Sequence, residues 1–437
     1  MKIAIAGYGL EGEANYNYWS QDPANELTIV DENESPKYAL PEGANTLLGA
    51  GVFERLDGFD LVIRTAGLSP YKIKTDGKIW SASNEFFAKC PARIIGVTGT
   101  KGKGTTSSLI AAILTSSGYT VHLVGNIGKS ALAELPQIQP DDIVVYELSS
   151  FQLWDLERSP HTGLVLIIEP EHLDVHRDYQ DYITAKSQIS AHQKAGETTY
   201  YRPNDHDSEW IANAGTRASG GVVFATPFIS TTGVHVADGQ FWNGEQLICS
   251  TDALQLVGQH NIENACAAIT VSLDYEKVTP ASITEGLRGF QGLPHRIEFV
   301  RTLEDVSYYN DSFSSSVPAT IAAVKSFTQP EIVIIGGVDR GGDFGHLIAD
   351  LSVRANIKEV VLIGQIRDKL FDLFKAIESP FVVTKLDAQT MPEVVDYCRE
   401  FASAGDVIIL SPGCASFDMF KDFYDRGDQF REYVNSL

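Results

Sequence analysis

The chain has 437 residues, of which 43% are hydrophobic and 21% charged, so it is long enough for roughly three globular domains and too apolar to be disordered. Its formal net charge of −23 and its pI near 4.8 argue against nucleic acid as a partner, because phosphate backbones bind basic surfaces. No apolar run approaches the ~18 residues that a membrane helix needs, the first residues already form a strand, and the five cysteines lack CxxC spacing. We therefore expect a cytoplasmic monomer with reduced thiols and no membrane partner.

The first segment alternates short apolar runs with helical stretches, and strands are predicted at residues 2–6, 27–30 and 61–64. A complete GxGxxG at residues 7–12 lies between the first two strands, and Asp31 ends the second. This spacing is typical of a dinucleotide-binding turn with an acid for a ribose hydroxyl. The same geometry serves any nucleotide diphosphate, so NAD(P) and another nucleotide stay alternatives at this point.

Residues 96–106 (GVTGTKGKGTT) are the most specific motif. They follow an apolar run and open onto a helix predicted over 107–114, an arrangement that aims backbone N–H groups at a triphosphate. Lys103 is placed to reach the β- and γ-phosphates, so ATP is the predicted co-substrate. The next residue, Gly104, lacks the hydroxyl that usually ligates Mg²⁺. Thr105 or Thr106 takes that place, or water completes the metal shell, and we favour Thr105.

The second segment continues the alternation, with strands predicted at 119–124, 143–147 and 164–168 and hence a parallel sheet. Glu147 ends one of these strands beside the phosphate loop, a position suited to Mg²⁺ coordination. Residues 198–255 change to short alternating runs, which predict a small antiparallel patch, and a helix follows over 258–273.

Two histidines, His172 and His176, follow the strand at 164–168. Their spacing of four residues does not predict a zinc site, because the neighbouring Asp and Pro residues favour a loop over one helical face. His172 at the strand exit is a candidate for binding a metal or a substrate, against the alternative of a structural histidine.

Lys186 lies within a helix predicted over 178–192, three residues from both Ile183 and Ile189, so it points inward with them. Such a lysine usually extends to solvent. The alternative is a buried amine with a depressed pKa that reacts with CO₂ and becomes a carbamate, an anionic oxygen ligand for a second Mg²⁺.

The third segment begins after a Gly- and Pro-containing hinge near residues 289–294, with parallel strands predicted at 331–335, 358–363 and 406–410. Its turns follow strands, where open α/β sheets place ligand sites, and so predict a second-substrate site. The whole chain is predicted to be α/β with three domains. These are a Rossmann-like domain at 1–90, a P-loop ATPase-type domain at 91–293 and a Rossmann-like domain at 294–437.

Taken together, the motifs resemble the Mur ligases over essentially the whole chain. The resemblance is carried, in the family's order, by residues 99–103, 125–128, 147–153, 171–174 and 292–296. Within the family, residues 147–153 (ELSSFQL) and 411–420 (SPGCASFDMF) resemble the D-glutamate-adding enzymes. The resemblance implies peptidoglycan precursor synthesis, in which ATP drives amide formation between UDP-N-acetylmuramoyl-L-alanine and D-glutamate through an acyl phosphate.

The resemblance also implies roles for individual residues. ATP would be bound by Gly99, Thr100, Lys101, Gly102, Lys103, Gly104, Thr105, Asn261, Arg296 and Asp311. The uridine diphosphate of the muramoyl substrate would be bound by Leu10, Glu11, Asp31, Thr65 and Gly67. Asn126 would contact the muramoyl substrate, and D-glutamate would be bound by Arg340, Ser416 and Phe423. Of two Mg²⁺ ions, one would be held by Thr105 and Glu147 and the other by His172 and carbamylated Lys186. The catalytic residues would be Lys103, His172 and Lys186.

The chain departs from the family's pattern at Gly104, Phe313, Arg340 and Glu11. Phe313 stands where many members carry Lys, so a D-glutamate contact is lost or is replaced by Ser314 or Ser315. Arg340 replaces a common Lys and offers a planar fork in place of a point charge. Glu11 is an acid near a pyrophosphate, tolerable only if it hydrogen-bonds uridine or the backbone.

Two alternatives to D-glutamate addition stay open at this point. A sister ligase would add another amino acid or extend folate, although a UDP-type first domain argues against the folate branch. A non-catalytic nucleotide-binding scaffold is the other, and the joint presence of Lys103, Glu147, His172 and Lys186 argues against it.

Overall fold

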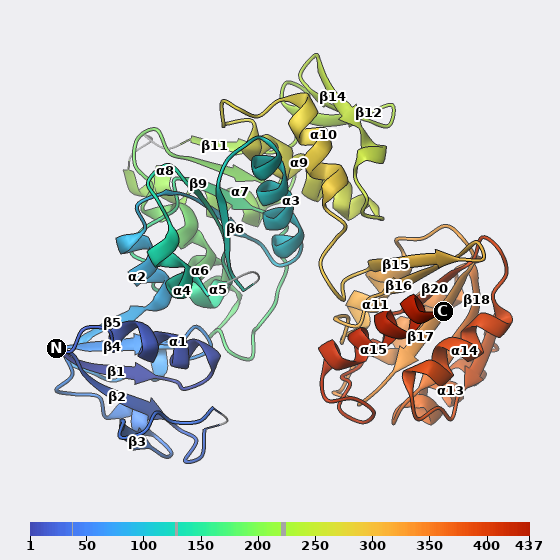
Figure 1. Cartoon of the computed structure of the whole chain (residues 1–437), viewed down its shortest axis with the longest axis horizontal. Helices are drawn as coiled ribbons and strands as arrows, with labels where there is room; N and C mark the ends of the chain where they lie inside the picture. Colours follow the sequence, from blue (N-terminus) through green and yellow to red (C-terminus); the bar gives the residue numbers. More distant parts are fainter. Residues whose placement is uncertain (37, 127–129, 220–223) are drawn as a thin grey trace. The chain divides into compact units, whose positions relative to one another are not determined.

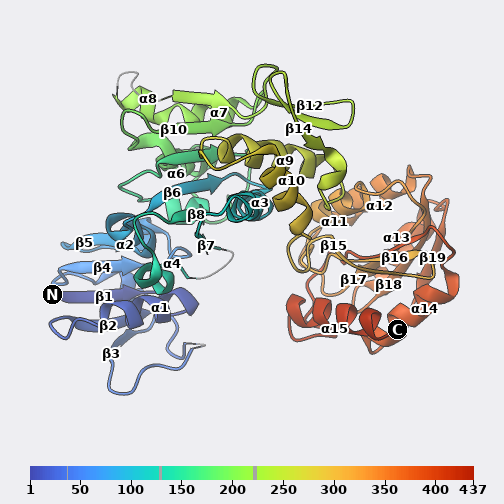
Figure 2. The same ribbon diagram turned by 45° about the horizontal axis from the view of Figure 1, so that its top comes forward.

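The computed structural model describes residues 1–36, 38–126, 130–219 and 224–437. It divides into two compact units, Met1–Leu254 with Ile262–Phe290, and Gln255–Asn261 with Gln291–Leu437. Figures 1 and 2 show parallel sheets flanked by helices, which confirms the predicted α/β class. None of the helices in the described part of the chain has the length and apolar character that a membrane crossing requires. All five cysteines are free thiols.

The first sheet of the first unit is parallel and has the strand order β3-β2-β1-β4-β5. Its elements are β1 (Lys2–Ala6), α1 (Leu10–Trp19), β2 (Glu26–Asp31), β3 (Asn45–Leu48), β4 (Leu61–Arg64), the 3₁₀ turn η2 (Pro70–Lys72), β5 (Lys78–Ser81) and α2 (Ala82–Lys89). The strand order reverses direction between β1 and β4, and a ligand crevice is expected at the carboxyl ends of the strands there.

The second sheet is also parallel, in the order β11-β10-β9-β6-β8-β7. Its strands and helices are β6 (Arg93–Thr98), α3 (Lys103–Ser116), β7 (Val121–Gly125), α4 (Ala131–Glu134), β8 (Ile143–Glu147), α5 (Ser150–Leu153), β9 (Thr162–Val165), α6 (Tyr179–Ala191), β10 (Thr198–Tyr201), α7 (His206–Ala212), α8 (Ala214–Ser219) and β11 (Phe224–Pro227). Because β6 lies between β8 and β9, the segments that follow all three strands meet at one sheet edge.

The antiparallel patch predicted over 198–255 is wrong in its first part. β10 and β11 extend the parallel sheet, and the antiparallel ladder begins only at Val234. Its three strands and the following helices are β12 (Val234–Ala237), β13 (Gln240–Asn243), β14 (Gln246–Ser250), α9 (Gln259–Ser272) and α10 (Pro280–Gly289). Short strands of either kind carry similar residues, so composition alone does not separate parallel from antiparallel pairing.

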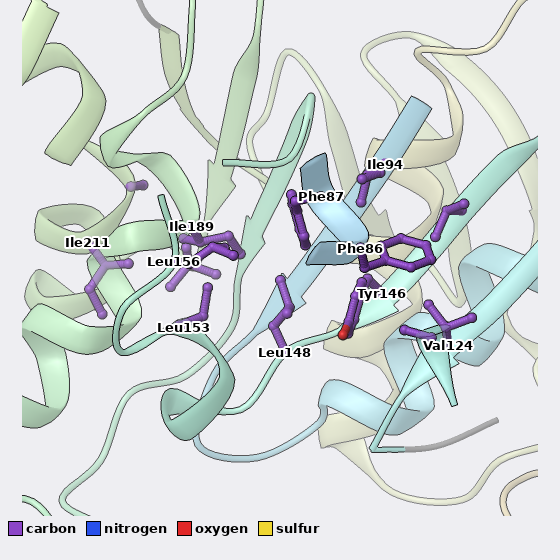
Figure 3. Close-up of a cluster of buried hydrophobic side chains, with 14 of the residues drawn as sticks. Phe86, Phe87, Ile94, Val124, Tyr146, Leu148, Leu153, Leu156, Ile189 and Ile211 are labelled. Atoms are coloured by element: carbon purple, nitrogen blue, oxygen red, sulfur yellow. The ribbon is translucent and has the colours of Figure 1, made fainter. Parts of the chain in front are cut away.

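Helix α2, which follows the last strand of the first sheet, packs into the hydrophobic core of the second sheet. Figure 3 shows Phe86 and Phe87 of α2 among side chains of the second sheet, and the Phe86 ring meets the Tyr146 ring edge-on with centroids 5.3 Å apart. Phe86 is fully buried, and burial of such a ring stabilises the fold by about 2–3 kcal/mol. Helix α2 is therefore part of the core of the second sheet, whereas the strands of the first sheet have hydrophobic clusters of their own.

The second unit has one mixed sheet in the order β15-β16-β20-β17-β18-β19, in which only the β15–β16 pair is antiparallel. Its elements are β15 (Glu298–Leu303), β16 (Val306–Asn310), α11 (Val317–Val324), β17 (Glu331–Gly336), α12 (Phe344–Ser352), β18 (Ile357–Ile363), α13 (Arg367–Ala376), β19 (Val382–Lys385), α14 (Met391–Phe401), β20 (Val407–Leu410) and α15 (Phe423–Ser436). Hydrophobic clusters lie on both faces of this sheet.

We predict that Glu331→Gln removes a pH-dependent weakness of the second unit. Glu331 is fully buried at the start of β17, and burial raises its pKa to about 8 even though Asn356 and Arg354 oppose the shift. The unfolded chain releases this proton at lower pH, so the stability that the protonated carboxyl contributes is lost as pH rises through the folded pKa. Between pH 5 and pH 8, the free energy of unfolding of the second unit, measured with urea, should fall less in Glu331→Gln than in the wild type. Glu400→Gln, at an exposed site on α14, should follow the wild type, and equal slopes for all three proteins would refute the prediction.

Candidate active site

The phosphate loop between β6 and α3 is built from glycines with backbone angles that side chains rarely adopt. Gly99 and Gly102 have φ of +151° and +83°, and a Cβ on Gly102 would lie 2.5 Å from Asn264 Oδ1. The loop is fastened by Thr100, whose N–H donates to Ile167 O at 2.7 Å and whose hydroxyl lies 2.7 Å from Tyr182 Oη. The loop conformation is therefore fixed by neighbouring segments.

Two lysine side chains converge on one carbonyl oxygen of this loop. Lys103 Nζ donates to Gly99 O at 3.0 Å and to Thr100 O at 2.9 Å, while Lys186 Nζ donates to the same Gly99 O at 2.8 Å. Lys186 is 2% exposed, in agreement with its predicted inward face. Burial, and then the Lys103 charge, lower the pKa of Lys186 well below its usual value, although Glu171 and Glu147 oppose the shift. The structure thus holds a buried amine beside the phosphate loop, in surroundings that disfavour its charged form.

Glu147 provides a buried carboxylate at the same sheet edge. It ends β8, is 5% exposed, and its charge acts on Lys186. Gly125, at the end of β7, allows the backbones to approach, since a Cβ there would lie 2.2 Å from Glu147 O. Asn126 is exposed beside it, while Ile127 and Gly128 of the same motif lie outside the described residues.

The donor set fits Mg²⁺ bound together with phosphate oxygens. Among the described residues, no group of three His, Cys, Asp or Glu side chains could hold a metal by itself. Mg²⁺ is usually held by one or two carboxylates and by substrate phosphates, which Glu147 beside the loop can satisfy. Thr105 is buried near the start of α3, and so is Thr106, whose hydroxyl makes no hydrogen bond within the described part of the chain.

The structure distinguishes the two histidines after β9. His172 is exposed, with φ of +57°, and its ring packs against Phe151 with centroids 4.8 Å apart. His176 is buried and its ring packs against those of both Phe151 and Trp154. Sequence reasoning gave His176 no role, because nothing in the loop composition indicates which of the two histidines is enclosed.

Lys101, the other basic residue of the loop, forms an ion pair with Glu169, with Nζ 2.6 Å from Oε2. Both side chains are largely exposed, so the pair contributes little to stability. Lys101 nevertheless lies at the loop surface, where it is accessible to a ligand.

The second candidate site lies at the carboxyl ends of β1 and β4. Asp31, expected from spacing alone to bind a ribose hydroxyl, instead accepts the N–H of Tyr8 at 2.6 Å and of Asn33 at 2.8 Å. Glu11 accepts the N–H of Ala66 at 2.8 Å, which is the backbone partner that this acid was expected to need. Burial raises the pKa of Glu11 despite this hydrogen bond.

Other predicted nucleotide contacts surround the same loops. Thr65 hydroxyl donates to Ala6 O at 3.2 Å, Leu10 is 70% exposed, and the Cβ position of Gly67 opens onto free space. Leu10 and Gly67 therefore leave this part of the surface open to a ligand.

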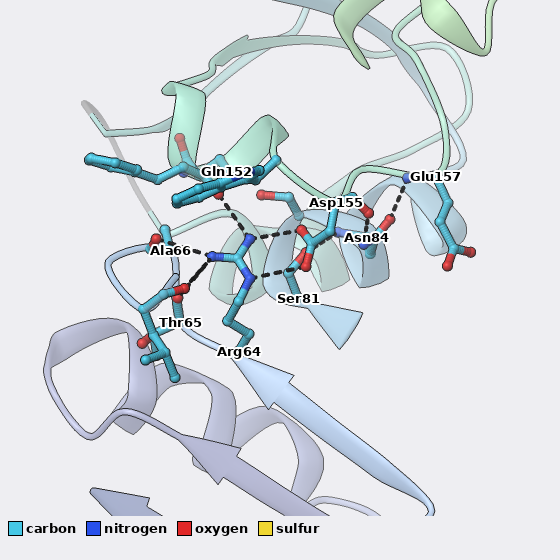
Figure 4. Close-up of polar contacts among 12 residues, drawn as sticks. Arg64, Thr65, Ala66, Ser81, Asn84, Gln152, Asp155 and Glu157 are labelled. Carbon is cyan, nitrogen blue, oxygen red and sulfur yellow. Dashed lines mark hydrogen bonds and ion pairs between the residues drawn. The ribbon is translucent and has the colours of Figure 1, made fainter. Parts of the chain in front are cut away.

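Arg64 holds these loops and was missed by sequence reasoning (Figure 4). Its fully buried guanidinium forms a two-point ion pair with Asp155, at 2.7 and 3.0 Å. The same group donates to the carbonyl oxygens of four further residues, Thr65, Ala66, Leu68 and Phe151. A charged residue ending the apolar strand at 61–64 was the available signal.

In the second unit, Asp311 is the most constrained of the predicted ATP contacts. It is 1% exposed, accepts Ser411 Oγ at 2.7 Å and Ile297 N–H at 3.1 Å, and burial raises its pKa to about 6. Arg296 stacks over Phe313 with Cζ 4.3 Å from the ring centroid. Asn261 donates its side-chain amide to Val257 O at 2.8 Å.

A cavity of about 300 Å³ is lined by Arg340, His346 and Ser315, among others. The other two predicted D-glutamate residues, Ser416 and Phe423, do not line it. Arg340 Cζ also lies 5.2 Å from the Phe417 ring centroid. Ser416 is buried, and the ring of Phe423 meets Phe313 at right angles, with centroids 5.2 Å apart.

A second buried arginine, Arg426, supports the loops around this cavity. It donates to Ser312 Oγ and Ser312 O, both at 2.9 Å, and to Cys414 O at 3.2 Å. Sequence reasoning missed it, because an arginine is normally a surface residue and no motif singles this one out.

Comparisons with known proteins agree with this geometry. A model of the Mur ligase middle domain matches residues 97–272. UDP-N-acetylmuramoylalanine–D-glutamate ligases from Clostridium tetani and Clostridium kluyveri are 32% and 36% identical to the chain, and each alignment covers 100% of the chain and 97% of the relative. The ligase of that name from Clostridium perfringens is 35% identical, over 90% of the chain and 87% of the relative.

Solved structures show the same fold at low sequence identity. UDP-N-acetylmuramate-alanine ligase MurC from Thermotoga maritima aligns with a TM-score of 0.58 at 16% identity, covering 100% of this chain and 99% of that one. MurF ligase from Thermotoga maritima in complex with ADP aligns with a TM-score of 0.58 at 15% identity, covering 99% of this chain and 94% of that one.

The chain belongs to the Mur ligase family of α/β enzymes. Within that family, the three relatives described above bear one name, that of the UDP-N-acetylmuramoylalanine–D-glutamate ligase.

We predict that Arg64→Lys destabilises the first unit by about 3 kcal/mol, because lysine cannot replace the two-point pair and leaves Asp155 and several carbonyls without donors. Chemical unfolding followed by tryptophan fluorescence measures the change. Lys78→Ala is the matched control, since Lys78 pairs with Glu157 between the same two sheets but with both side chains about half exposed. Its effect should stay below about 1 kcal/mol. Equal losses in the two variants would contradict the role given to Arg64.

Proposed function

We propose that this protein is an ATP-dependent ligase that joins D-glutamate to UDP-N-acetylmuramoyl-L-alanine in peptidoglycan precursor synthesis. The observation that carries the proposal is the buried Lys186 amine, held on the same loop carbonyl as Lys103. Full-length relatives that bear the name of this activity support it. We also propose three domains, at 1–90, 91–293 and 294–437, in a monomer located in the cytoplasm.

The reaction has two steps. A carboxylate oxygen of the muramoyl substrate attacks the γ-phosphorus of ATP, and ADP leaves. The amine of D-glutamate then attacks the acyl carbonyl, phosphate leaves, and the amine loses a proton to give the amide. Positioning and charge neutralisation dominate such chemistry, and the loop N–H groups with Lys103 supply both at the phosphates. Of the other loop residues, Gly99, Thr100, Lys101, Gly102 and Gly104 would contact the same phosphates.

Lys186 would act as a carbamate. The lone pair of its neutral amine forms an N–C bond to CO₂, and one N–H proton passes to solvent, which converts a cation into an anionic oxygen donor. Two Mg²⁺ ions would be held, one by Thr105 and Glu147 and the other by His172 and carbamylated Lys186. When bound, Mg²⁺ supplies positive charge that neutralises the phosphate and acyl oxygens.

The remaining residues are proposed to bind substrates. Leu10, Glu11, Asp31, Thr65 and Gly67 would surround the uridine nucleotide, and Asn126 would contact the muramoyl substrate. Asn261, Arg296 and Asp311 would contact ATP. Arg340 and Ser416 would bind the carboxylates of D-glutamate, with Phe423 packing on its chain. Because Asp31 and Glu11 already accept backbone N–H groups, their roles would be to shape the nucleotide loops.

The test is phosphate release from ATP in the presence of UDP-N-acetylmuramoyl-L-alanine and one amino acid at a time. We expect turnover with D-glutamate and none with L-glutamate, L-lysine, meso-diaminopimelate or no amino acid. Turnover with a different amino acid would assign the chain to a sister ligase. ATP binding without turnover would support the scaffold alternative.

We predict that Lys186→Ala lowers kcat at least about hundredfold, because the site loses an anionic ligand at the reacting groups. Short carboxylates such as acetate or formate should restore part of the rate by occupying the vacated space. The measurement is D-glutamate-dependent phosphate release with increasing carboxylate concentration. Lys194→Ala, which removes an exposed lysine just after α6, should keep full activity. Full activity of Lys186→Ala would remove the carbamate from the mechanism.

A further inference from the structure

The hydroxyl of Tyr71 is one of the links between the two sheets of the first unit, and it lies beside the candidate active site. Tyr71, in η2, donates to Asp181 Oδ1 at 2.5 Å. The guanidinium of Arg177 stacks on the Tyr71 ring, with Cζ 3.2 Å from its centroid. Tyr71 follows directly on the Thr65–Leu68 loop whose carbonyls Arg64 holds. The loop proposed to bind uridine thus has its far end fixed to α6.

Asp181 collects hydrogen bonds from several elements. Its Oδ1 also lies 3.4 Å from Trp154 Nε1, and its Oδ2 lies 3.0 Å from His176 Nδ1 and 3.3 Å from Arg177 N. Burial would raise the pKa of Asp181, but the hydrogen bonds from Tyr71, His176 and Arg177 together lower it. Asp181 is therefore an anion whose place is fixed by its donors.

His176 extends this connection to the segment that follows Glu147. Its Nε2 lies 3.0 Å from Ser150 Oγ at the start of α5. Burial lowers the pKa of His176, and a neutral ring donates through Nδ1 to Asp181 and accepts the Ser150 hydroxyl at Nε2. The segment after β8, the loop after β9 and α6 are thus joined through one ring.

The first turns of α6 carry three groups that reach different parts of the site. Asp181 accepts Tyr71, Tyr182 Oη lies 2.7 Å from Thr100 Oγ1, and Lys186 Nζ donates to Gly99 O at 2.8 Å. A helix transmits a displacement of its first turn along its axis, because its backbone hydrogen bonds make it stiff. Asp181 and Lys186 are thus held by one helix, which connects the Tyr71 contact to the phosphate loop.

We infer that Asp181 is a positioning residue: by accepting the Tyr71 hydroxyl, it ties the uridine loop to α6, so that binding of the UDP substrate steadies the Lys186 amine for carbamylation. The inference rests on the proposed function. It adds a coupling between the proposed UDP-substrate loop and the Lys186 amine, which does not follow from membership of the family. Such a coupling is reciprocal, so carbamylation should in turn favour binding of the UDP substrate.

The test compares Tyr71→Phe with Tyr179→Phe. Tyr179 lies on α6, the helix that carries Asp181. Its hydroxyl also donates to a carboxylate at 2.5 Å, but that carboxylate belongs to Asp207 on α7. Each full-length protein is freed of CO₂ and titrated with ¹³C-bicarbonate, with and without UDP-N-acetylmuramoyl-L-alanine. The ¹³C carbamate signal is measured by NMR, alongside kcat and KM.

In the wild type and Tyr179→Phe, the UDP substrate should lower the bicarbonate concentration needed for half-maximal carbamate signal. Tyr71→Phe should lose this response, and its kcat should fall about tenfold, the loss expected for one hydrogen bond to a charged group. The KM for ATP should not change. Asp181→Asn should show the same loss, and the double variant no further loss, since both changes remove one connection.

A substrate response in Tyr71→Phe equal to that in Tyr179→Phe would overturn the inference. Absence of any carbamate signal in a wild-type enzyme that is active with D-glutamate would also overturn it, while leaving the ligase assignment intact. Should Tyr71→Phe fail to fold, the substrate response of Asp181→Asn decides instead: a response equal to that of Tyr179→Phe would overturn the inference. Absence of D-glutamate-dependent turnover, by contrast, would count against the proposed function.

Discussion

The carbonyl oxygen of Gly99, shared by Lys103 and Lys186, is the constraint around which the first unit's candidate site is arranged. Two ammonium groups on one acceptor repel each other, and only one of them reaches solvent. The enclosed amine therefore gives up its charge more easily, as the direction of its pKa shift shows. Meeting this constraint requires a glycine loop, a helix that crosses behind it, and a neighbouring carboxylate. The parallel order of β9, β6 and β8 brings these three together at one edge.

Buried arginines serve a common purpose in both units. Arg64 and Arg426 each direct a planar set of donors at backbone carbonyls of loops that follow strands. Because these loops are irregular, their carbonyls have no ladder or helix partners, and an arginine satisfies several at once. The carbonyls of these loops are thereby hydrogen-bonded without being part of a sheet.

The sequence patterns predicted most of the parallel strands and the helix around Lys186 with small errors at their ends, because apolar periodicity is a local signal. The helix predicted over 107–114 begins four residues earlier, at Lys103, and β3, β5 and β19 were not predicted. The start of the antiparallel ladder at Val234 was not predicted, since strand pairing depends on partners distant in the chain. The enclosed position of His176 and the hub at Asp181 were also missed. Their significance comes from Tyr71, more than a hundred residues away. Networks of this kind have no spacing rule, so no motif indicates them.

Two acids fix the loops that we propose to bind the uridine nucleotide. Asp31 and Glu11 accept the N–H groups of Tyr8 and Ala66, which follow β1 and β4 respectively. Conformational entropy of these loops is thus lost when the chain folds and need not be lost again on binding of the proposed nucleotide. The loops are preorganised. Association there should resemble the docking of rigid surfaces, and differences in affinity between nucleotides should lie mainly in their rates of departure.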